Sequence, residues 1–191
     1  MIAAIKEDSK IFIGYTDKKE ESVALGDYLC RENIPCFTDG DLIVFFAISN
    51  ASSDYLTRSG EIFSGELSVD TIRSSVLPQI KKAAEKLHGV TNGRWQNAAV
   101  ICKNGRLFSI ASDFYVKEEN DYVCIGYSPE YARSVLDTER GLPPKERIAK
   151  AFEFHKNSTG EGGCPVIYID SEETRLKVLS GGGDDEYIIG L

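Results

Sequence analysis

Hydrophobic and polar positions alternate in two short segments at the start of the chain. Residues 2–6 (IAAIK) and 11–15 (IFIGY) have the pattern of strands, and the polar residues EDSK between them form a turn. A continuous apolar run, LIVFFAI at residues 42–48, follows the turn residues TDGD. A run this short, and this rich in Ile, Val and Phe, predicts a strand that is buried on both faces.

Helical spacing of apolar residues begins after this strand. One helix can start at Asn50 or Ser52, and a second is predicted in SVDTIRSSVLPQIKKAAEKLHG, with Ser68 as its N-cap and Gly89 as its C-cap. Pro78 predicts a kink or a break within the second helix. The predicted buried face of this helix comprises Val69, Ile72, Val76, Ile80, Ala83, Ala84 and Leu87.

The second half of the chain has strands, then helices, then strands again. Asn104-Gly105 lies between two alternating segments and is a strong hairpin signal. Prolines suit the first turns of the two helices. The predicted strands are 97–103, 106–112, 114–118 and 121–126, the helices extend from Pro129 to about Leu136 and from Pro144 to about His155, and the closing strands are 164–170 and 175–181.

This order of elements defines a fold class. Strands joined by hairpins form antiparallel sheets, and helices that come in separated pairs cover the outer faces of such sheets. We therefore expect an α+β fold, a four-layer α-β-β-α sandwich of two antiparallel sheets flanked by helices. The 191 residues are enough for one domain with a substantial core, and that domain is expected to span residues 1–191.

Composition and charge narrow the possible partners and the cellular compartment. A formal net charge of -8 argues against nucleic acid or an anionic membrane as the main partner. No apolar run is long enough to span a bilayer, and the first residues, MIAAIKEDSK, lack the features of a signal peptide. The five cysteines contain no C-x-x-C pair and are expected to be reduced thiols in a cytoplasmic protein, with Cys102 and Cys124 in the core.

Neither a metal nor a cofactor is expected. The chain has two histidines, His88 and His155, and no ligand spacing surrounds either of them. His155 lies at a helix end beside Lys156, where a histidine is typically a surface residue or a cap partner.

The stretch DYVCIGYSPEYARSVLD has the form of a binding site. A strand ends at Gly126, and a helix that begins at Pro129 follows directly. Together with the two residues before it, this stretch is similar to the part of proteasome β-subunits and bacterial HslV in which an acidic loop leads to a strand, a small-residue turn and P-[YF]-[AV]-x-x-x-L. Four more segments resemble the same family in the same order: IAAIKEDSKIFIGYTD, FTDGDLIVFFAISNASSD, AAVICKNGRLFSIASD and LPPKERIAKAFEFHKNSTGEGGCPVIYID.

The resemblance covers nearly the whole chain and implies the fold of N-terminal nucleophile (Ntn) hydrolases. In that family, a threonine at the mature N-terminus attacks a peptide carbonyl, and its own α-amino group serves as the base. A buried lysine, held by an acid of the first hairpin, lowers the relevant pKa values. Backbone N–H groups that follow the cleft strand form the oxyanion hole.

The resemblance places Met1 at or next to the position of the threonine. Methionine offers only a thioether, which is not a nucleophile of this kind, and the next residue, Ile2, carries no nucleophile either. Asp17 corresponds to the hairpin acid, or Thr16 does if no gap is introduced. Asn33 stands at the lysine position. We therefore expect the protein to be an inactive relative of threonine-type peptidases.

The cleft strand also departs from the family pattern. Phe45 stands where the family has the glycine that opens the substrate pocket, so its ring either fills that pocket or belongs to the core. Ala47 and Ile48 correspond to the residues whose backbone forms the oxyanion hole, a role that any residue type can perform.

The supporting hydroxyl groups are displaced as well. Gly126 stands at the position of a supporting serine, with Ser128 nearby, and Asn157-Ser158 corresponds to a later Asp-Ser pair. The segment from Gly126 onward thus keeps the turn and the helix of the family but not the hydroxyl group at this position.

Three hypotheses about function remain open from the sequence. The first is a non-catalytic relative that acts through assembly or partner binding, with no nucleic-acid or membrane partner. The second is a peptidase or amidohydrolase with a non-standard nucleophile, for which Cys30 and Cys36 lie near the cleft. The third is a protein that binds a small ligand in the former cleft. A homo-oligomer is expected. The apolar C-terminus DEYIIGL either packs back on its own sheet or docks on a neighbouring subunit, and the Leu67-Ile72-Val76 side of the second helix could supply a second contact.

Overall fold

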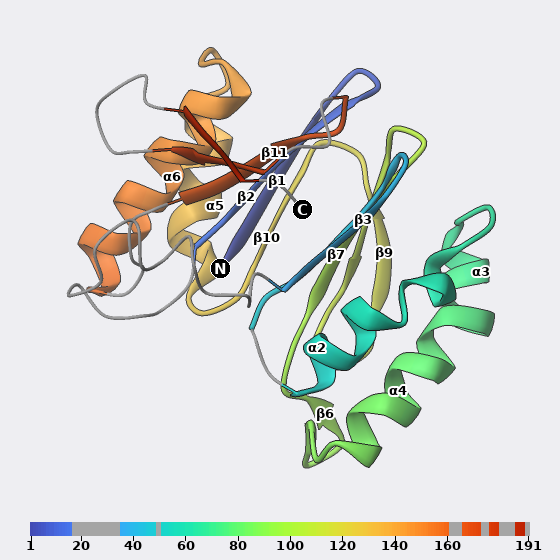
Figure 1. The fold of residues 1–191 in the computed structure, drawn as a ribbon. Coiled ribbons are helices and arrows are strands. Elements are labelled where there is room, and N and C mark those ends of the chain that lie inside the picture. Colours follow the sequence, from blue (N-terminus) through green and yellow to red (C-terminus); the bar gives the residue numbers. More distant parts are fainter. Residues whose placement is uncertain (17–34, 49–50, 161–165, 173–175, 180–185, 190–191) are drawn as a thin grey trace.

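Two antiparallel sheets lie face to face, and helices cover the outer side of each sheet (Figure 1). The computed structural model describes residues 1–16, 35–48, 51–160, 166–172, 176–179 and 186–189. Helices α5 (Pro129–Thr138) and α6 (Pro144–Thr159) cover one sheet. The helical segments α2 (Ala51–Arg58), η1 (Gly60–Phe63), α3 (Val69–Thr71), η2 (Ile72–Val76) and α4 (Leu77–Lys86) cover the other. The four-layer α+β arrangement expected from the sequence is confirmed.

The larger sheet has six strands in the order β10-β1-β2-β11-β12-β13. Its first hairpin was predicted from the alternation at the start of the chain. The strands are β1 (Ile2–Glu7), β2 (Lys10–Tyr15), β10 (Tyr122–Ile125), β11 (Val166–Asp170), β12 (Leu176–Leu179) and β13 (Glu186–Ile189). Because β13 pairs antiparallel with β12, the apolar segment near the C-terminus folds back onto its own sheet.

The smaller sheet has five strands in the order β3-β4-β7-β8-β9. The Asn104-Gly105 turn joins β7 to β8 as predicted, with φ values of 50° and 65°. The strands are β3 (Cys36–Asp39), β4 (Leu42–Phe46), β7 (Ala99–Lys103), β8 (Arg106–Ile110) and β9 (Val116–Glu119), and β5 (Val90–Thr91) pairs with β6 (Arg94–Trp95) in a separate hairpin. All five residues of β4 are buried, as its unbroken apolar run predicted.

The core has three parts, one between each pair of neighbouring layers. One part lies between the two sheets and includes Ile2 and Ile13 from the larger sheet and Ile43 and Val100 from the smaller one. Another fills the space between the larger sheet and α5 and α6. The third lies between the smaller sheet and the helical segments from α2 to α4. Both faces of each sheet are therefore covered by apolar side chains.

Helix α3–η2–α4 remains continuous through Pro78, where the sequence predicted a kink or a break. Proline lacks the N–H that would bond to the carbonyl four residues earlier, and its ring crowds that carbonyl. The turn before Pro78 widens into the π-helical segment η2, in which Leu77 N–H donates to Ile72 O. A π-turn removes the tight contact without ending the helix. Ile72, Val76, Ile80, Ala83 and Ala84 are buried, as predicted, whereas Val69 and Leu87 at the two ends of the predicted face are only partly buried.

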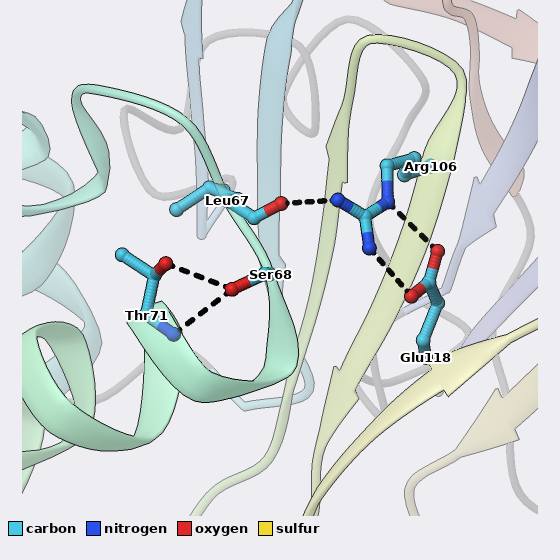
Figure 2. Close-up of polar contacts among 5 residues, drawn as sticks. All are labelled: Leu67, Ser68, Thr71, Arg106 and Glu118. Atoms are coloured by element: carbon cyan, nitrogen blue, oxygen red, sulfur yellow. Dashed lines mark hydrogen bonds and ion pairs between the residues drawn. The ribbon is translucent and has the colours of Figure 1, made fainter.

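The start of this helix is attached to the smaller sheet by Arg106 (Figure 2). The guanidinium of Arg106 forms two hydrogen bonds to Glu118, of 2.8 and 2.7 Å, and donates a third to Leu67 O at 2.7 Å. Next in the chain, Ser68 Oγ accepts a hydrogen bond from Thr71 N–H at 3.1 Å. Ser68 is therefore the N-cap that the sequence predicted.

The end of the helix differs from the prediction, which made Gly89 the C-cap. The C-cap is Leu87, and the left-handed residue that follows is His88, with φ of 55°. His88 N–H donates to Glu85 O and Gly89 N–H donates to Ala84 O, the hydrogen-bond pattern of a Schellman motif. His88 rather than Gly89 therefore adopts the backbone conformation for which glycine is normally preferred.

The predicted oligomer contact along Leu67, Ile72 and Val76 is wrong. These side chains are 3%, 0% and 1% exposed and pack in the core beneath the smaller sheet. A helix that covers a sheet must turn its apolar stripe inward, so this stripe is not available to a neighbouring subunit.

Candidate functional site

A cavity of about 620 Å³ opens where β1 begins and where β4, β8 and β10 end. The starts of β7 and α5, the hairpin strand β6 and the last turns of α6 complete its wall. The lining residues are Met1, Thr16, Ala47, Ile48, Arg94, Trp95, Gln96, Asn97, Ala98, Ala111, Ser112, Cys124, Ile125, Gly126, Tyr127, Pro129 and His155. The structure thus brings to one cavity seven residues that were singled out from the sequence: Met1, Thr16, Ala47, Ile48, Cys124, Gly126 and His155.

Met1 is held at the head of β1 by backbone contacts. Its nitrogen donates to Thr16 O at 2.5 Å, and its carbonyl accepts from Thr16 N–H at 2.9 Å. The turn after β10 lies directly against it: a Cβ at Gly126 would be 2.9 Å from Met1 Cα. Gly126 has φ of 128°, which side-chain-bearing residues rarely adopt. Glycine at this position therefore allows both the turn and its close approach to Met1.

The turn from Gly126 to Ser128 is fastened to α6 by His155. His155 Nε2 lies 2.8 Å from Tyr127 O, and the side chain is only 2% exposed. The expectation of a surface histidine or a cap partner is therefore wrong. His155 lies one turn before the end of α6, which continues to Thr159, and its side chain contacts the turn before α5 rather than a free helix end. Ser128 adopts a left-handed conformation with φ of 43° and makes no side-chain capping hydrogen bond.

The backbone amides proposed for the oxyanion hole already have partners. Ala47 N–H donates to Ala98 O at 2.9 Å, and Ile48 N–H donates to Asn97 Oδ1 at 3.0 Å. Asn97 completes the bridge by donating to Ile48 O at 2.8 Å. A substrate oxygen would have to displace these bonds before either amide could stabilise it.

Phe45 belongs to the core between the two sheets and does not line the cavity. Its side chain is fully buried, and its ring centroid lies 6.0 Å from that of Tyr15 in the opposite sheet. Of the two roles considered for this side chain, the structure supports the core role.

The remaining predicted positions lie away from the cavity or outside the described residues. Asn157 and Ser158 are exposed in the last turn of α6, and neither they nor Ser128 are among the cavity-lining residues. Asp17 and Asn33 fall outside the described residues. Neither Ser128 nor Ser158 contributes a hydroxyl group to the cavity wall, whereas Thr16, the alternative match to the hairpin acid, lines the cavity and is hydrogen-bonded to Met1 through its backbone.

The thiols in the described part of the chain are poor nucleophiles. Cys124 lines the cavity, and its burial raises the pKa of its thiol to about 12. Cys36 lies in β3 and packs against the core between the sheets, where desolvation also raises the pKa of its thiol. A thiol attacks as the thiolate, so both groups are almost entirely in the unreactive form at neutral pH. Cys30 falls outside the described residues.

Sequence reasoning missed four polar lining residues: Arg94, Gln96, Asn97 and Ser112. Arg94 follows the tight turn at Asn92-Gly93, which joins β5 to β6, and Ser112 lies just after β8. The Asn-Gly pair before Arg94 was an available hairpin signal. The pairing of Trp95 N–H with Ser112 O, at 2.8 Å, joins the two segments and could not be read from a local pattern.

No group of three or more His, Cys, Asp or Glu side chains in the described part of the chain is arranged to hold a metal ion. No helix among the described residues combines the length and the apolar character needed to cross a membrane.

The two stacked sheets and their helix layers form the fold seen in solved structures of proteasome-like Ntn hydrolases. No protein-family model matches the chain, and no curated protein does. Solved structures show the likeness. BPH from Thiobacillus denitrificans, in complex with epoxomicin, has a TM-score of 0.69 at 17% sequence identity, over 88% of this chain and 96% of that chain.

Two further solved structures agree with this assignment. Anbu (ancestral beta-subunit) from Yersinia bercovieri has a TM-score of 0.63 at 16% identity, over 98% of this chain and 86% of that one. HslV from Trypanosoma brucei has a TM-score of 0.51 at 14% identity, over 88% of this chain and 97% of that one. The fold that the resemblance implied is thus confirmed.

Proposed function

We propose that this chain is a proteasome-like subunit without threonine-type peptidase activity, which acts through assembly and through binding at its cavity. The observation that carries the proposal is the residue at the head of β1. Met1 lies against the Gly126 turn, at or just after the position where the resemblance places the nucleophilic threonine, and its side chain has no hydroxyl group. Ile2, the next residue, is fully buried between Ile125 and Tyr15 of the neighbouring strands.

The state of the surrounding groups supports the same proposal. The amides of Ala47 and Ile48 are bonded to Ala98 and Asn97, so no oxyanion hole is preformed there. The second candidate, hydrolysis by a non-standard nucleophile, would have to rely on Cys124 among the described thiols, because this thiol lines the cavity. Its raised pKa argues against this role.

An epoxyketone tests the proposal directly. Epoxomicin is bound in the structure of BPH, and such warheads are directed at N-terminal threonine. We expect intact-mass spectrometry to show no adduct after this protein is incubated with epoxomicin, because Met1 offers no hydroxyl group. The purified protein should likewise leave standard proteasome peptides uncleaved. A stoichiometric adduct at the N-terminal residue would contradict the proposed loss of activity.

A Met1→Thr variant sharpens the test. If the nucleophile were the only missing part, this substitution would restore cleavage. Because the amides of Ala47 and Ile48 remain engaged, we expect the variant to cleave standard peptides no faster than the unmodified protein. Efficient cleavage by Met1→Thr would show that the rest of the site is intact.

Assembly is the other part of the proposal. Relatives of this type work as stacked rings, and we expect this cytoplasmic chain to form a homo-oligomer. Two half-exposed aromatic side chains, Tyr131 of α5 and Phe154 of α6, lie with ring centroids 6.3 Å apart on the outer helix layer and provide apolar contact area. Light scattering at micromolar concentration should give a mass that is a multiple of 21.1 kDa. A monomer would contradict this prediction.

A further inference from the structure

The cavity combines an apolar side with a polar corner. Met1, Ala98 and Ile125 are among the apolar lining residues, and Arg94 and Ser112 are polar lining residues that form what we call the polar corner. The last two residues lie on adjacent segments, because Trp95, which follows Arg94, donates its N–H to Ser112 O. The cavity therefore offers two different environments to one small ligand.

Both polar groups of this corner are available. Within the described part of the chain, neither the guanidinium of Arg94 nor the hydroxyl group of Ser112 has a hydrogen-bond, ion-pair or ring partner. Arg106, by contrast, uses its guanidinium on Glu118 and Leu67 O. A free guanidinium offers parallel N–H donors that match a carboxylate, and a hydroxyl group can donate one more hydrogen bond.

The charge of the wall favours an anion. Acidic residues outnumber Lys and Arg by 30 to 22 in the chain, yet the described residues that line the cavity include no Asp or Glu. Asp113, next to Ser112, is exposed, and its Oδ1 accepts a hydrogen bond from Tyr115 N–H at 3.0 Å. A carboxylate in the cavity would thus meet Arg94 without a competing acid on the described wall.

We propose that the cavity binds a small monocarboxylic acid with an apolar body. Its carboxylate contacts Arg94 and Ser112, and its body packs against Met1, Ala98 and Ile125. The volume of about 620 Å³ is ordinary for a small-molecule site. This inference deepens the proposed function and rests on the part of it that assigns binding to the cavity.

A matched pair of probes tests the carboxylate. We expect isothermal titration calorimetry to show that 4-phenylbutyrate binds about tenfold more tightly than 4-phenylbutyramide, because only the acid forms charge-assisted hydrogen bonds with the guanidinium. Arg94→Gln should weaken binding of the acid about tenfold and leave binding of the amide nearly unchanged. Arg58→Gln is the control, since Arg58 is an exposed residue of α2 that does not line the cavity.

A second variant tests the location of the apolar body. Ala111 lines the cavity and is only partly buried, so Ala111→Phe should occupy the space while the protein stays folded, as a melting curve will verify. Binding of both probes should then be lost. Equal affinity for the acid and the amide, an unchanged affinity in Arg94→Gln, or undiminished binding in Ala111→Phe would overturn the inference.

The two proposals fail in different ways. An epoxomicin adduct would overturn the proposed loss of peptidase activity and would leave carboxylate binding untouched. Absence of 4-phenylbutyrate binding at millimolar concentration, in a protein that also forms no adduct, would overturn the carboxylate site alone.

Discussion

Replacing Phe45 by alanine is expected to lower the free energy of unfolding by about 3–5 kcal/mol. The ring is fully buried in β4, at the contact between the two sheets, and faces Tyr15 of the opposite sheet. Its removal takes apolar surface from the core and leaves a cavity that close-packed neighbours cannot fill. Urea unfolding followed by circular dichroism measures the change.

Tyr55→Ala is the control, because it removes an aromatic ring from an exposed position in α2. Tyr55 is 48% exposed, so its loss should cost about 1 kcal/mol or less. If Phe45→Ala were as mild as this control, the ring would stand in an open substrate pocket rather than in the core. Comparison of the two variants therefore also decides between the two roles that the sequence left open for Phe45.

Replacing Gly14 by alanine is the other substitution from which we expect a large effect. Gly14 lies in β2 beneath α6, and a Cβ there would be 2.4 Å from Ile148 Cγ2 and 2.8 Å from Phe152 Cε2. Both side chains are buried, so the helix or the strand has to move. We expect a loss of about 1–3 kcal/mol in the free energy of unfolding, seen as a lower melting temperature.

Two further variants show whether crowding is the cause. Gly141→Ala adds the same methyl group where nothing lies within 4 Å, and it should leave the melting temperature nearly unchanged. In Gly14→Ala combined with Ile148→Ala, the loss should be smaller than the sum of the two single losses, because the second change removes the clashing atom. Strict additivity would mean that the contact with Ile148 is not the origin of the effect.

The local patterns of the sequence were sufficient for most of the elements. Alternation predicted β1 and β2, the unbroken apolar run predicted the buried strand β4, and Asn104-Gly105 predicted a hairpin. These features depend on neighbours within a few residues, so they can be read one segment at a time. Ser68 as a helix cap belongs to the same group, because its hydrogen bond to Thr71 N–H lies within one turn.

The helix from Val69 to Lys86 shows the limit of such local rules. Pro78 predicted a kink or a break, and Gly89 was expected to end the helix. Instead, a π-turn precedes Pro78, and His88 has a left-handed backbone conformation. Because α4 packs its buried face on the smaller sheet, tertiary contacts can outweigh a local preference of about 1 kcal/mol at a single residue.

The sequence by itself determined the order of most of the elements, the sandwich of two sheets and the presence of methionine at the head of β1, but it did not predict β3, the β5–β6 hairpin or β13. Only the tertiary structure decided that β9 and β10, neighbours in the chain, join different sheets, and that Arg94 and Ser112 share one cavity wall. It also decided that His155 is buried against Tyr127. The physical reason is the sequence separation of the contacts involved. Alternation and capping depend on nearby residues, whereas the sheet that a strand joins and the burial of a polar side chain depend on contacts between segments far apart in the chain.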